Sequence, residues 1–368
     1  MWFLFSLFFA FSLPSDSLQT PVTIAAEPGK IYVERGADGR QHLNFDFILH
    51  NQSQEKLIVN KIEVSVFDES GKLSFRTFVD EYGRKSLELA AQPSIEKQSS
   101  MLLYNPFHCF ASEISLKKLH YEFSFSSEDR KKYFESEIDV FPTFYETKTN
   151  LTLPLRGSVL VWDGHDYNSH HRRVDYTQEV FVKSGLKTNF QRYAYDFVIV
   201  DESGSHFKGR KLNDDWYRND KPGVLEDYFS FGAPVYAAGA GRVVYVKDTV
   251  LNNQFALSDL DADERALFGN YVVIDHLNGE FSMFGHLKPG SVTVKAGEMV
   301  KQGQPIAAVG STGSSLFPHL HYELRDGTGI KEVEGLPSYF SNFHRINGSR
   351  AMKVKKGAIN TGDIVNWK

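Results

Sequence analysis

The chain has 368 residues, of which 41% are hydrophobic, 14% aromatic and 24% charged, and this composition excludes a disordered chain, a collagen-like repeat and a polytopic membrane protein. Lys and Arg number 41 and Asp and Glu 46, giving a net charge of −5; no dense basic block occurs, so we expect no nucleic-acid partner. At roughly 100–200 residues per domain, the length predicts two domains. The single cysteine, Cys109, excludes an intrachain disulfide and any cluster of cysteine ligands, so a metal would have to be bound by His, Asp or Glu.

The N-terminus begins with an apolar run. Residues 2–13 carry no charge, and Asp16 is the first charged residue. The run is too short to span a bilayer as a helix but matches the hydrophobic region of a secretory signal peptide. We therefore predict a signal peptide over residues 1–20, no stable transmembrane segment, and export to the periplasm or cell envelope. The run lacks a preceding basic segment and a clear cleavage site, so a buried N-terminal strand or a wrongly assigned start are the alternatives.

Residues 21–154 show a period of two. Apolar and polar residues alternate along 42–49, 62–67, 121–125 and 134–140, and turn-forming residues separate these segments. In the first segment the apolar positions are Leu43, Phe45, Phe47 and Leu49, and the polar positions between them include His42, Asn44 and Asp46. Short alternating strands with polar turns predict an antiparallel β-sandwich. Its histidines are scattered without ligand spacing, so we expect a structural or binding module here.

The second half contains the residues that suggest catalysis. It has no serine-nucleophile elbow, phosphate-binding loop or HExxH helix, but it contains the sequence PHLHYEL at 318–324. In a strand, positions i and i+2 share a face, so His319 and His321 project together while Leu320 points the other way. Two adjacent imidazoles suit a metal, or one ligand beside an acid/base group. The small residues at 310–315 let the backbone turn closely beside such a site.

Asp196 is a carboxylate within the apolar run 192–200, which we expect to be a strand. Aspartate is rarely buried unless it is paired or binds a metal, so Asp196 is either in an ion pair, for instance with Arg192, or a ligand. His286 ends another predicted strand and is a second candidate site residue. His276 also ends a strand, and we interpret it as mainly structural.

Taken in order, these motifs resemble the lysostaphin-type zinc metallopeptidases, which mostly cleave peptide cross-links in bacterial peptidoglycan. The resemblance covers about 192–325, roughly a third of the chain. It rests on the segments FGAPVYAA at 231–238, GRVV at 241–244, GNYVVI at 269–274, GHL at 285–287, VKQGQPI at 300–306, GSTGS at 310–314 and HLH at 319–321. It implies an antiparallel β-sheet peptidase domain over 155–368, and hence an all-β protein.

The resemblance also implies roles for the site residues. Asp196 and His321 would bind Zn²⁺, and His286 and His319 would flank the attacking water as general base and oxyanion stabiliser. Three protein ligands leave a fourth position for water, whose pKa zinc lowers toward ~7. The implied activity is zinc-dependent hydrolysis of peptide bonds, with peptidoglycan cross-links or stem peptides as substrate.

One position departs from the family pattern. The family usually has its first zinc ligand, a histidine, four residues before the aspartate, but this chain has Arg192 there, and arginine cannot bind zinc. A branch of the family with a similar Arg-Tyr-Ala-x-Asp strand has Asn-x-His upstream, and NSH at 168–170 fits that spacing. His170 is therefore the first choice for the third ligand, His171 the second and His165 the third. On an extended segment adjacent residues point in opposite directions, so His170 and His171 should not both bind.

The alternative function is a degenerate, non-catalytic domain that binds the cell wall or regulates a partner hydrolase. The arginine at position 192 favours this alternative, whereas the presence of the four other site residues argues against it. We also expect the long polar and aromatic segment 201–230 to form a rim of the substrate groove.

Overall fold

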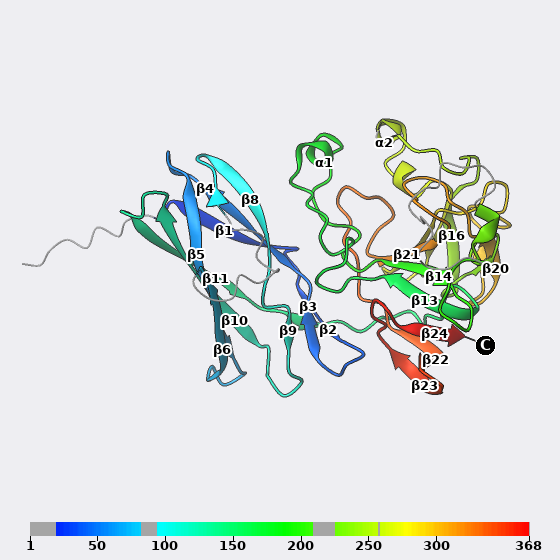
Figure 1. Ribbon diagram of the computed structural model, residues 1–368, viewed down its shortest axis with the longest axis horizontal. Coiled ribbons are helices and arrows are strands. Elements are labelled where there is room, and N and C mark those ends of the chain that lie inside the picture. Colours follow the sequence, from blue (N-terminus) through cyan, green and yellow to red (C-terminus); the bar gives the residue numbers. More distant parts are fainter. Residues whose placement is uncertain (1–19, 82–93, 209–224, 257, 368) are drawn as a thin grey trace, which may run out of the picture.

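The computed structural model describes residues 20–81, 94–208, 225–256 and 258–367 (Figure 1). Within these ranges the regular secondary structure is nearly all β-strand, and the strands pair mostly antiparallel, which confirms the all-β class. The signal peptide predicted over residues 1–20 lies outside the described residues, apart from Thr20. In the described part of the chain, none of the helices has the length and apolar character needed to cross a membrane.

The front part is a β-sandwich (Figure 1). One sheet has the order β1-β4-β8, the second has the order β11-β10-β5-β6 with β7 beside β5, and a smaller sheet has the order β12-β2-β3-β9. The strand bounds are β1 Val22–Glu27, β2 Tyr32–Arg35, β3 Gln41–Leu43, β4 Asp46–Asn51, β5 Leu57–Phe67, β6 Leu73–Asp80, β7 Ser94–Ile95, β8 Ser99–Tyr104, β9 Cys109–Phe110, β10 Lys118–Ser127, β11 Tyr133–Val140 and β12 Thr143–Phe144.

The sandwich core follows the predicted alternation. Phe47 of β4 packs edge-on against Tyr121 and Phe123 of β10, with ring centroids 4.9 and 5.0 Å apart. Burying each such side chain stabilises the fold by about 1.5–3 kcal/mol relative to leaving it exposed. The polar positions of the same run are not all in solvent, because Asn44 and Asp46 are also buried, with 5% and 0% of their surface exposed. The second half of the chain covers them.

The second part is built on one ten-stranded sheet of order β19-β16-β17-β18-β21-β14-β13-β24-β22-β23, beside a small sheet of β15 and β20. In the described parts of the connections lie two short α-helices and two 3₁₀-helices. The bounds are β13 Gly157–Asp163, α1 Glu179–Lys183, β14 Tyr195–Ile199, η1 Leu225–Asp227, β15 Pro234–Tyr236, β16 Gly241–Lys247, α2 Asp259–Ala262, η2 Ala266–Phe268, β17 Tyr271–Asp275, β18 Phe281–Gly285, β19 Met299–Val300, β20 Pro305–Ala308, β21 Leu320–Arg325, β22 Phe340–Asn347, β23 Arg350–Gly357 and β24 Ile364–Trp367.

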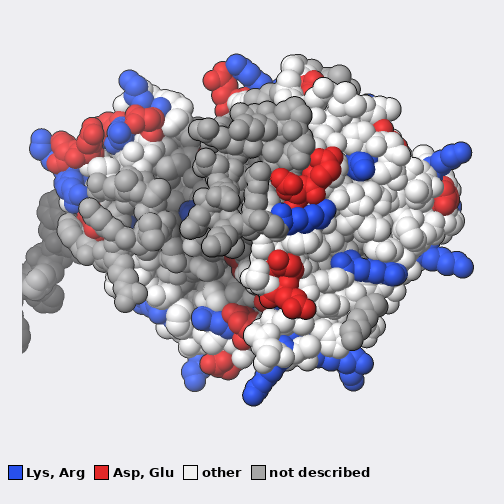
Figure 2. All heavy atoms as spheres, turned by 45° about the vertical axis from the view of Figure 1, so that its right-hand side comes forward, with Lys and Arg blue, Asp and Glu red and all other residues white. Residues whose placement is uncertain are grey.

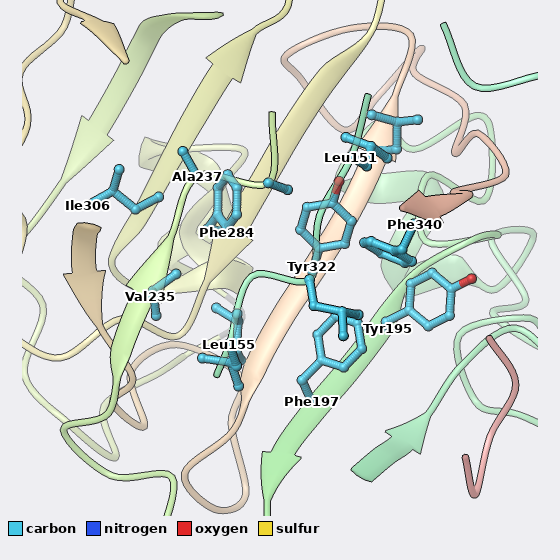
Figure 3. Packing of buried hydrophobic residues seen from close by; sticks show 14 of the residues in the cluster. Leu151, Leu155, Tyr195, Phe197, Val235, Ala237, Phe284, Ile306, Tyr322 and Phe340 are labelled. Atoms are coloured by element: carbon cyan, nitrogen blue, oxygen red, sulfur yellow. The ribbon is translucent and has the colours of Figure 1, made fainter. Parts of the chain in front are cut away.

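The core of this part lies on one face of the long sheet (Figure 3). Tyr322 of β21 packs between neighbouring aromatic rings, with centroids 5.7 Å from Phe340 and 5.4 Å from Phe284. Leu151 and Leu155, which precede β13, are fully buried in the same cluster. The chain therefore contributes to this core slightly before the boundary predicted near residue 155. Because Tyr322 points into the core, His321 and Glu323 on either side of it point to the opposite face of the strand.

Charged side chains of both signs are interspersed over the described surface in Figure 2. One edge strand of the long sheet, β23, carries exposed Lys353, Lys355 and Lys356. Lysines on an edge strand discourage pairing with the edge of another sheet. These exposed lysines therefore have a structural role at the edge of the sheet.

Candidate metal centre

Asp196 and His321 face each other across two neighbouring strands. They are direct partners in the antiparallel register of β14 and β21, and Oδ1 of Asp196 lies 3.0 Å from Nδ1 of His321. Strand β18 pairs with the other edge of β21, with Gly285 opposite His321, so the next residue, His286, reaches the same place. Only 5% of Asp196 and 2% of His321 is exposed. The imidazole therefore offsets part of the cost of burying the carboxylate.

His319 and His286 complete this face. Nε2 of His319 lies 3.4 Å from Oδ1 of Asp196, and the ring centroids of His286 and His319 are 4.7 Å apart. Nδ1 of His319 donates to the carbonyl of Phe317 at 2.8 Å, and Nδ1 of His286 donates to the carbonyl of Thr312 at 2.7 Å. A neutral imidazole carries one proton, so the bond to Thr312 leaves Nε2 of a neutral His286 ring unprotonated and able to accept a proton. Nε2 of His319 instead faces the carboxylate of Asp196, which is a hydrogen-bond acceptor.

The upstream histidines lie in a tight turn. The backbone N–H of Arg173 donates to the carbonyls of Ser169 at 3.2 Å and His170 at 3.1 Å. The rings of His170 and His171 consequently lie side by side, with centroids 3.9 Å apart. The expectation that adjacent residues here point in opposite directions is wrong, because it assumed an extended segment. Nε2 of His171 lies 3.5 Å from Oδ1 of Asp196, and Nε2 of His170 lies 4.0 Å from Oδ2.

The two upstream histidines differ in burial and in partners. The His171 side chain is 1% exposed, and its Nδ1 donates to the carbonyl of Gly164 at 3.1 Å, which leaves Nε2 to face Asp196. The His170 side chain is 65% exposed, and its Nδ1 lies 2.5 Å from Oδ2 of Asp163. The geometry favours His171 over His170, the reverse of the order expected from the Asn-x-His spacing.

His165 and Arg192 both point toward the front sandwich. Nε2 of His165 lies 2.8 Å from Oε2 of Glu34, and Nη1 of Arg192 donates to Oδ2 of Asp46 at 2.7 Å. Among the described residues the sequence-based ion pair between Arg192 and Asp196 is not formed, because the arginine points away from the site. Arg192 also lies in a turn rather than in the predicted strand, since β14 begins only at residue 195.

The charges of the cluster suit a divalent cation. Burial alone would raise the pKa of Asp196, but the imidazoles of His319 and His171 outweigh it and hold that pKa well below its ordinary value. Burial, assisted by His170, lowers the pKa of His171 well below its ordinary value. An ionised carboxylate and neutral imidazoles are the forms that bind metals. His171, Asp196 and His321 each offer one ligand atom, and these atoms lie within 4.8 Å of one another. This set of nitrogen and oxygen donors fits zinc.

Two acidic residues that the sequence reasoning did not single out contact the histidines. Nε2 of His321 donates to Oε1 of the buried Glu323 at 2.6 Å. Burial alone would lower the pKa of His321, but its hydrogen bonds with Asp196 and Glu323 raise it to about 9, so a cation must displace a proton from this ring. Asp163, at the end of β13, contacts both upstream histidines. Strand alternation from residue 321 could have identified Glu323. The contacts of Asp163 with His170 and His171 could not be foreseen, because they depend on the turn in which these histidines lie.

A cavity of about 450 Å³ opens beside the cluster. Its polar lining consists of Gln191, Ser314 and the cluster residues His170, His171, Asp196, His286, His319 and His321. The rest of its wall is apolar: Trp162, Val174, Phe181, Leu186, Phe190, Leu260, Leu267, Phe268, Leu316, Phe317 and Ile330. A mainly apolar hollow with a few convergent polar groups is typical of a ligand site. The rim expected from residues 201–230 lies partly outside the described residues and stays a prediction.

Comparison with known proteins identifies the family. A model described as Peptidase family M23 matches residues 226–335. Lipoprotein NlpD of Yersinia enterocolitica is 32% identical over 109 residues, which are 29% of this chain and 94% of NlpD. The chain belongs to peptidase family M23. The M23 match contains His286, His319 and His321, whereas Asp196 and the upstream histidines precede it.

Two further relatives are matched over a smaller fraction of their own length. The chain is 34% identical to peptidoglycan DD-endopeptidase ShyA of Vibrio cholerae serotype O1 over 148 residues, which are 40% of this chain and 30% of ShyA. It is 41% identical to murein hydrolase activator EnvC of Escherichia coli K12 over 58 residues, which are 16% of this chain and 13% of EnvC. The chain thus spans less than a third of the length of either relative.

Proposed function

We propose that this M23 chain is a zinc-dependent endopeptidase that hydrolyses peptide bonds in peptidoglycan, in cross-links or stem peptides. The observation that carries the proposal is the buried group of His171, Asp196 and His321, with ligand atoms within 4.8 Å of one another and His286 and His319 beside it. The name of ShyA, a peptidoglycan DD-endopeptidase, supports the substrate class.

In this proposal His171, Asp196 and His321 hold the metal. His170 remains the alternative to His171, because its Nε2 lies only slightly farther from the Asp196 carboxylate. His165 is the weakest of the three upstream choices, since its ring is engaged by Glu34. When bound, zinc polarises the scissile carbonyl and acidifies the attacking water.

In this proposal His286 transfers the proton of the attacking water, and His319 stabilises the negative charge that develops on the carbonyl oxygen. Burial, reinforced by His319 and His321, lowers the pKa of His286 well below its ordinary value, which keeps this ring neutral and able to accept a proton at Nε2. His286 would take the proton that water loses as its oxygen attacks the carbonyl carbon. When the C–N bond breaks, the same proton passes to the departing amine. His319, when protonated at Nε2, would donate to the oxyanion.

The metal content of the purified protein and digestion of isolated peptidoglycan test the proposal together. We expect about one zinc per chain, as a three-ligand catalytic site predicts, and release of peptide fragments from the polymer. His321→Ala should abolish both, whereas His344→Ala, a histidine of β22 outside the cluster, should leave both unchanged. A folded wild-type protein with neither zinc nor turnover would reject the endopeptidase.

A non-catalytic M23 domain that regulates a partner hydrolase is the second candidate function. Two observations favour it: Arg192 stands where the family resemblance expects a ligand, and EnvC, a relative, is named as a hydrolase activator. This candidate predicts that the purified chain digests no peptidoglycan alone but accelerates a separate hydrolase. Acceleration that persists in His321→Ala would favour it over the endopeptidase.

We propose that the protein acts in the cell envelope. The apolar run at residues 2–13 and relatives named as a lipoprotein and a peptidoglycan endopeptidase support this location. Fractionation of cells that express the full chain tests it: the protein should be found with the periplasm or the envelope, and recovery in the cytosol alone would contradict the proposal.

A further inference from the structure

The carboxylate of Asp46 joins the two halves of the chain. Asp46 begins β4 of the sandwich and is fully buried. Nη1 of Arg172 donates to its Oδ1 at 2.6 Å, and Nη1 of Arg192 donates to its Oδ2 at 2.7 Å. Both arginine side chains belong to the second half, and at most 1% of either is exposed. A buried carboxylate whose two oxygens each accept a charged hydrogen bond is held in one geometry.

Both arginines are neighbours in sequence of proposed zinc ligands. Arg172 directly follows His171, and Arg192 precedes Asp196 by four residues. The buried amide of Asn189 connects the two segments, since its Nδ2 donates to the carbonyls of His171 at 2.9 Å and Arg172 at 3.3 Å. The main chain at His171 is therefore held by Asn189 and is followed directly by Arg172, whose side chain contacts the sandwich.

Backbone contacts fix the same junction. Nη2 of Arg172 donates to the carbonyl of Phe45 at 2.7 Å, and Nδ2 of Asn44 donates to the carbonyl of Arg192 at 2.7 Å. The two residues that directly precede β4 thus hold one arginine by its guanidinium and the other by its main chain. The bidentate use of the Arg172 fork sets its direction as well as its distance.

Apolar and aromatic contacts extend this junction to the cavity wall. Ile48 of β4 and Leu102 of β8 pack against the hydrophobic cluster that contains Leu186 and Phe190, two residues of the wall. The hydroxyl of Tyr104 donates to the carbonyl of Arg173 at 2.7 Å. In Figure 1 the segment that carries α1 lies between the sandwich and the long sheet. The sandwich therefore supports both the histidine turn and one wall of the cavity.

We propose that the front sandwich helps to form the metal centre: Asp46 holds Arg172 and Arg192, and through them positions His171 to bind zinc. The inference rests on the proposed function. It also explains why this chain has Arg192 where the family pattern has a histidine ligand: the arginine side chain contacts the sandwich. Asp46 touches neither metal nor substrate and is a positioning residue. Two other roles make different predictions: a contact that only adds stability would leave zinc affinity unchanged, and a removable lid would limit access to the site.

The test compares zinc affinities by chelator competition in folded full-length proteins, well below the unfolding temperature. Asp46→Asn keeps the shape of the side chain but removes the negative charge that pairs with Arg172 and Arg192. We expect it to weaken zinc binding about 10-fold or more, the usual effect of losing a group that orients a ligand. Glu63→Gln is the matched control, because Glu63 is also buried in the sandwich but pairs with Lys61 and Arg76. Its zinc affinity should equal that of the wild type.

Arg172→Lys provides a second variant in case Asp46→Asn does not fold, since it keeps the charge but loses the bidentate fork; it should also weaken zinc binding. If either folded variant binds zinc as tightly as the wild type, the inference is wrong. If Asp46→Asn also turns over substrate faster than the wild type at unchanged zinc affinity, the sandwich acts as a lid instead. If the wild type itself binds no zinc, the proposed function and this inference both fail. If the wild type binds zinc and His321→Ala does not, unchanged binding in Asp46→Asn rejects the inference alone.

Discussion

Nε2 of His321 donates a hydrogen bond to Oε1 of Glu323, two residues farther along the same strand, at 2.6 Å. Glu323 has no exposed surface. The bond fixes the plane of the imidazole and leaves Nδ1 directed at Asp196, 3.0 Å away. A carboxylate behind a metal-binding histidine also raises the basicity of the ring. Glu323 therefore has the position of a residue that orients a ligand.

Glu323→Gln should weaken zinc binding while the protein stays folded. The amide still fits the space but no longer attracts the Nε2–H of His321 with a full charge, so we expect zinc affinity to fall about 10-fold. Chelator competition measures the loss. Glu280→Gln is the control, because Glu280 is equally buried but accepts hydrogen bonds from Tyr145, Lys148 and Thr149. Equal zinc affinities in the two variants would show that Glu323 does not contribute to metal binding.

Strand periodicity explains which features the sequence could predict. The alternation at Leu43–Leu49 placed the sandwich core correctly, because side chains on a strand change face at every residue. The same rule placed His319 and His321 together, and both contact Oδ1 of Asp196. These are local properties of single strands, so a single sequence contains them.

Contacts between distant segments were not predictable in the same way. Asp46 looked like a solvent-facing strand residue, yet it is buried because the second half of the chain supplies Arg172 and Arg192. The rings of His170 and His171 lie together only because residues around them form a turn. Neither the partner of a buried charge nor the curvature of a loop is encoded in a period of two or in a ligand spacing.

Separate alanine variants should distinguish the two upstream histidines. His171→Ala removes a buried imidazole whose Nε2 faces Asp196, so we expect zinc content to fall from about one per chain toward zero. His170→Ala removes a ring that is 65% exposed, and zinc content should stay near the wild-type value. Metal analysis after gel filtration measures both. The opposite result would restore the order expected from the Asn-x-His spacing.

The contact between the two halves should weaken in acid through His108. This ring stacks on Tyr167 with centroids 4.1 Å apart, and burial, together with the nearby His42 and Arg172, lowers its pKa to about 4. The unfolded chain has a histidine pKa of about 6.5 and binds a proton first, so the stabilisation is complete above pH ~6.5 and is lost as pH falls toward 4.

His108→Phe keeps a ring for stacking but cannot take up a proton. Thermal unfolding measured from pH 8 to pH 4 should therefore show a steeper loss of stability in the wild type than in this variant, with the difference confined to the range below pH ~6.5. Curves that run parallel over the whole range would show that His108 does not couple the contact to pH.

Two glycines with nearly the same backbone conformation should differ in their tolerance of a methyl group. Gly313 has φ +70°, and a Cβ there would lie 2.3 Å from the backbone nitrogen of Gly269 and 2.5 Å from the carbonyl oxygen of Leu267. Gly290 has φ +68° and nothing within 4 Å of the same position. Alanine at either position adds left-handed strain of about 1–2 kcal/mol, but only Gly313→Ala also forces two backbone segments apart.

Gly313→Ala should therefore lower the free energy of unfolding by about 1–3 kcal/mol more than Gly290→Ala, as measured by denaturant titration. It should also impair catalysis, because the carbonyl of the preceding Thr312 accepts the hydrogen bond from Nδ1 of His286 at 2.7 Å. A displaced carbonyl would no longer hold the ring in the tautomer that accepts a proton at Nε2. Equal stability and equal turnover in the two variants would show that the close approach of these backbones does not fix the His286 ring.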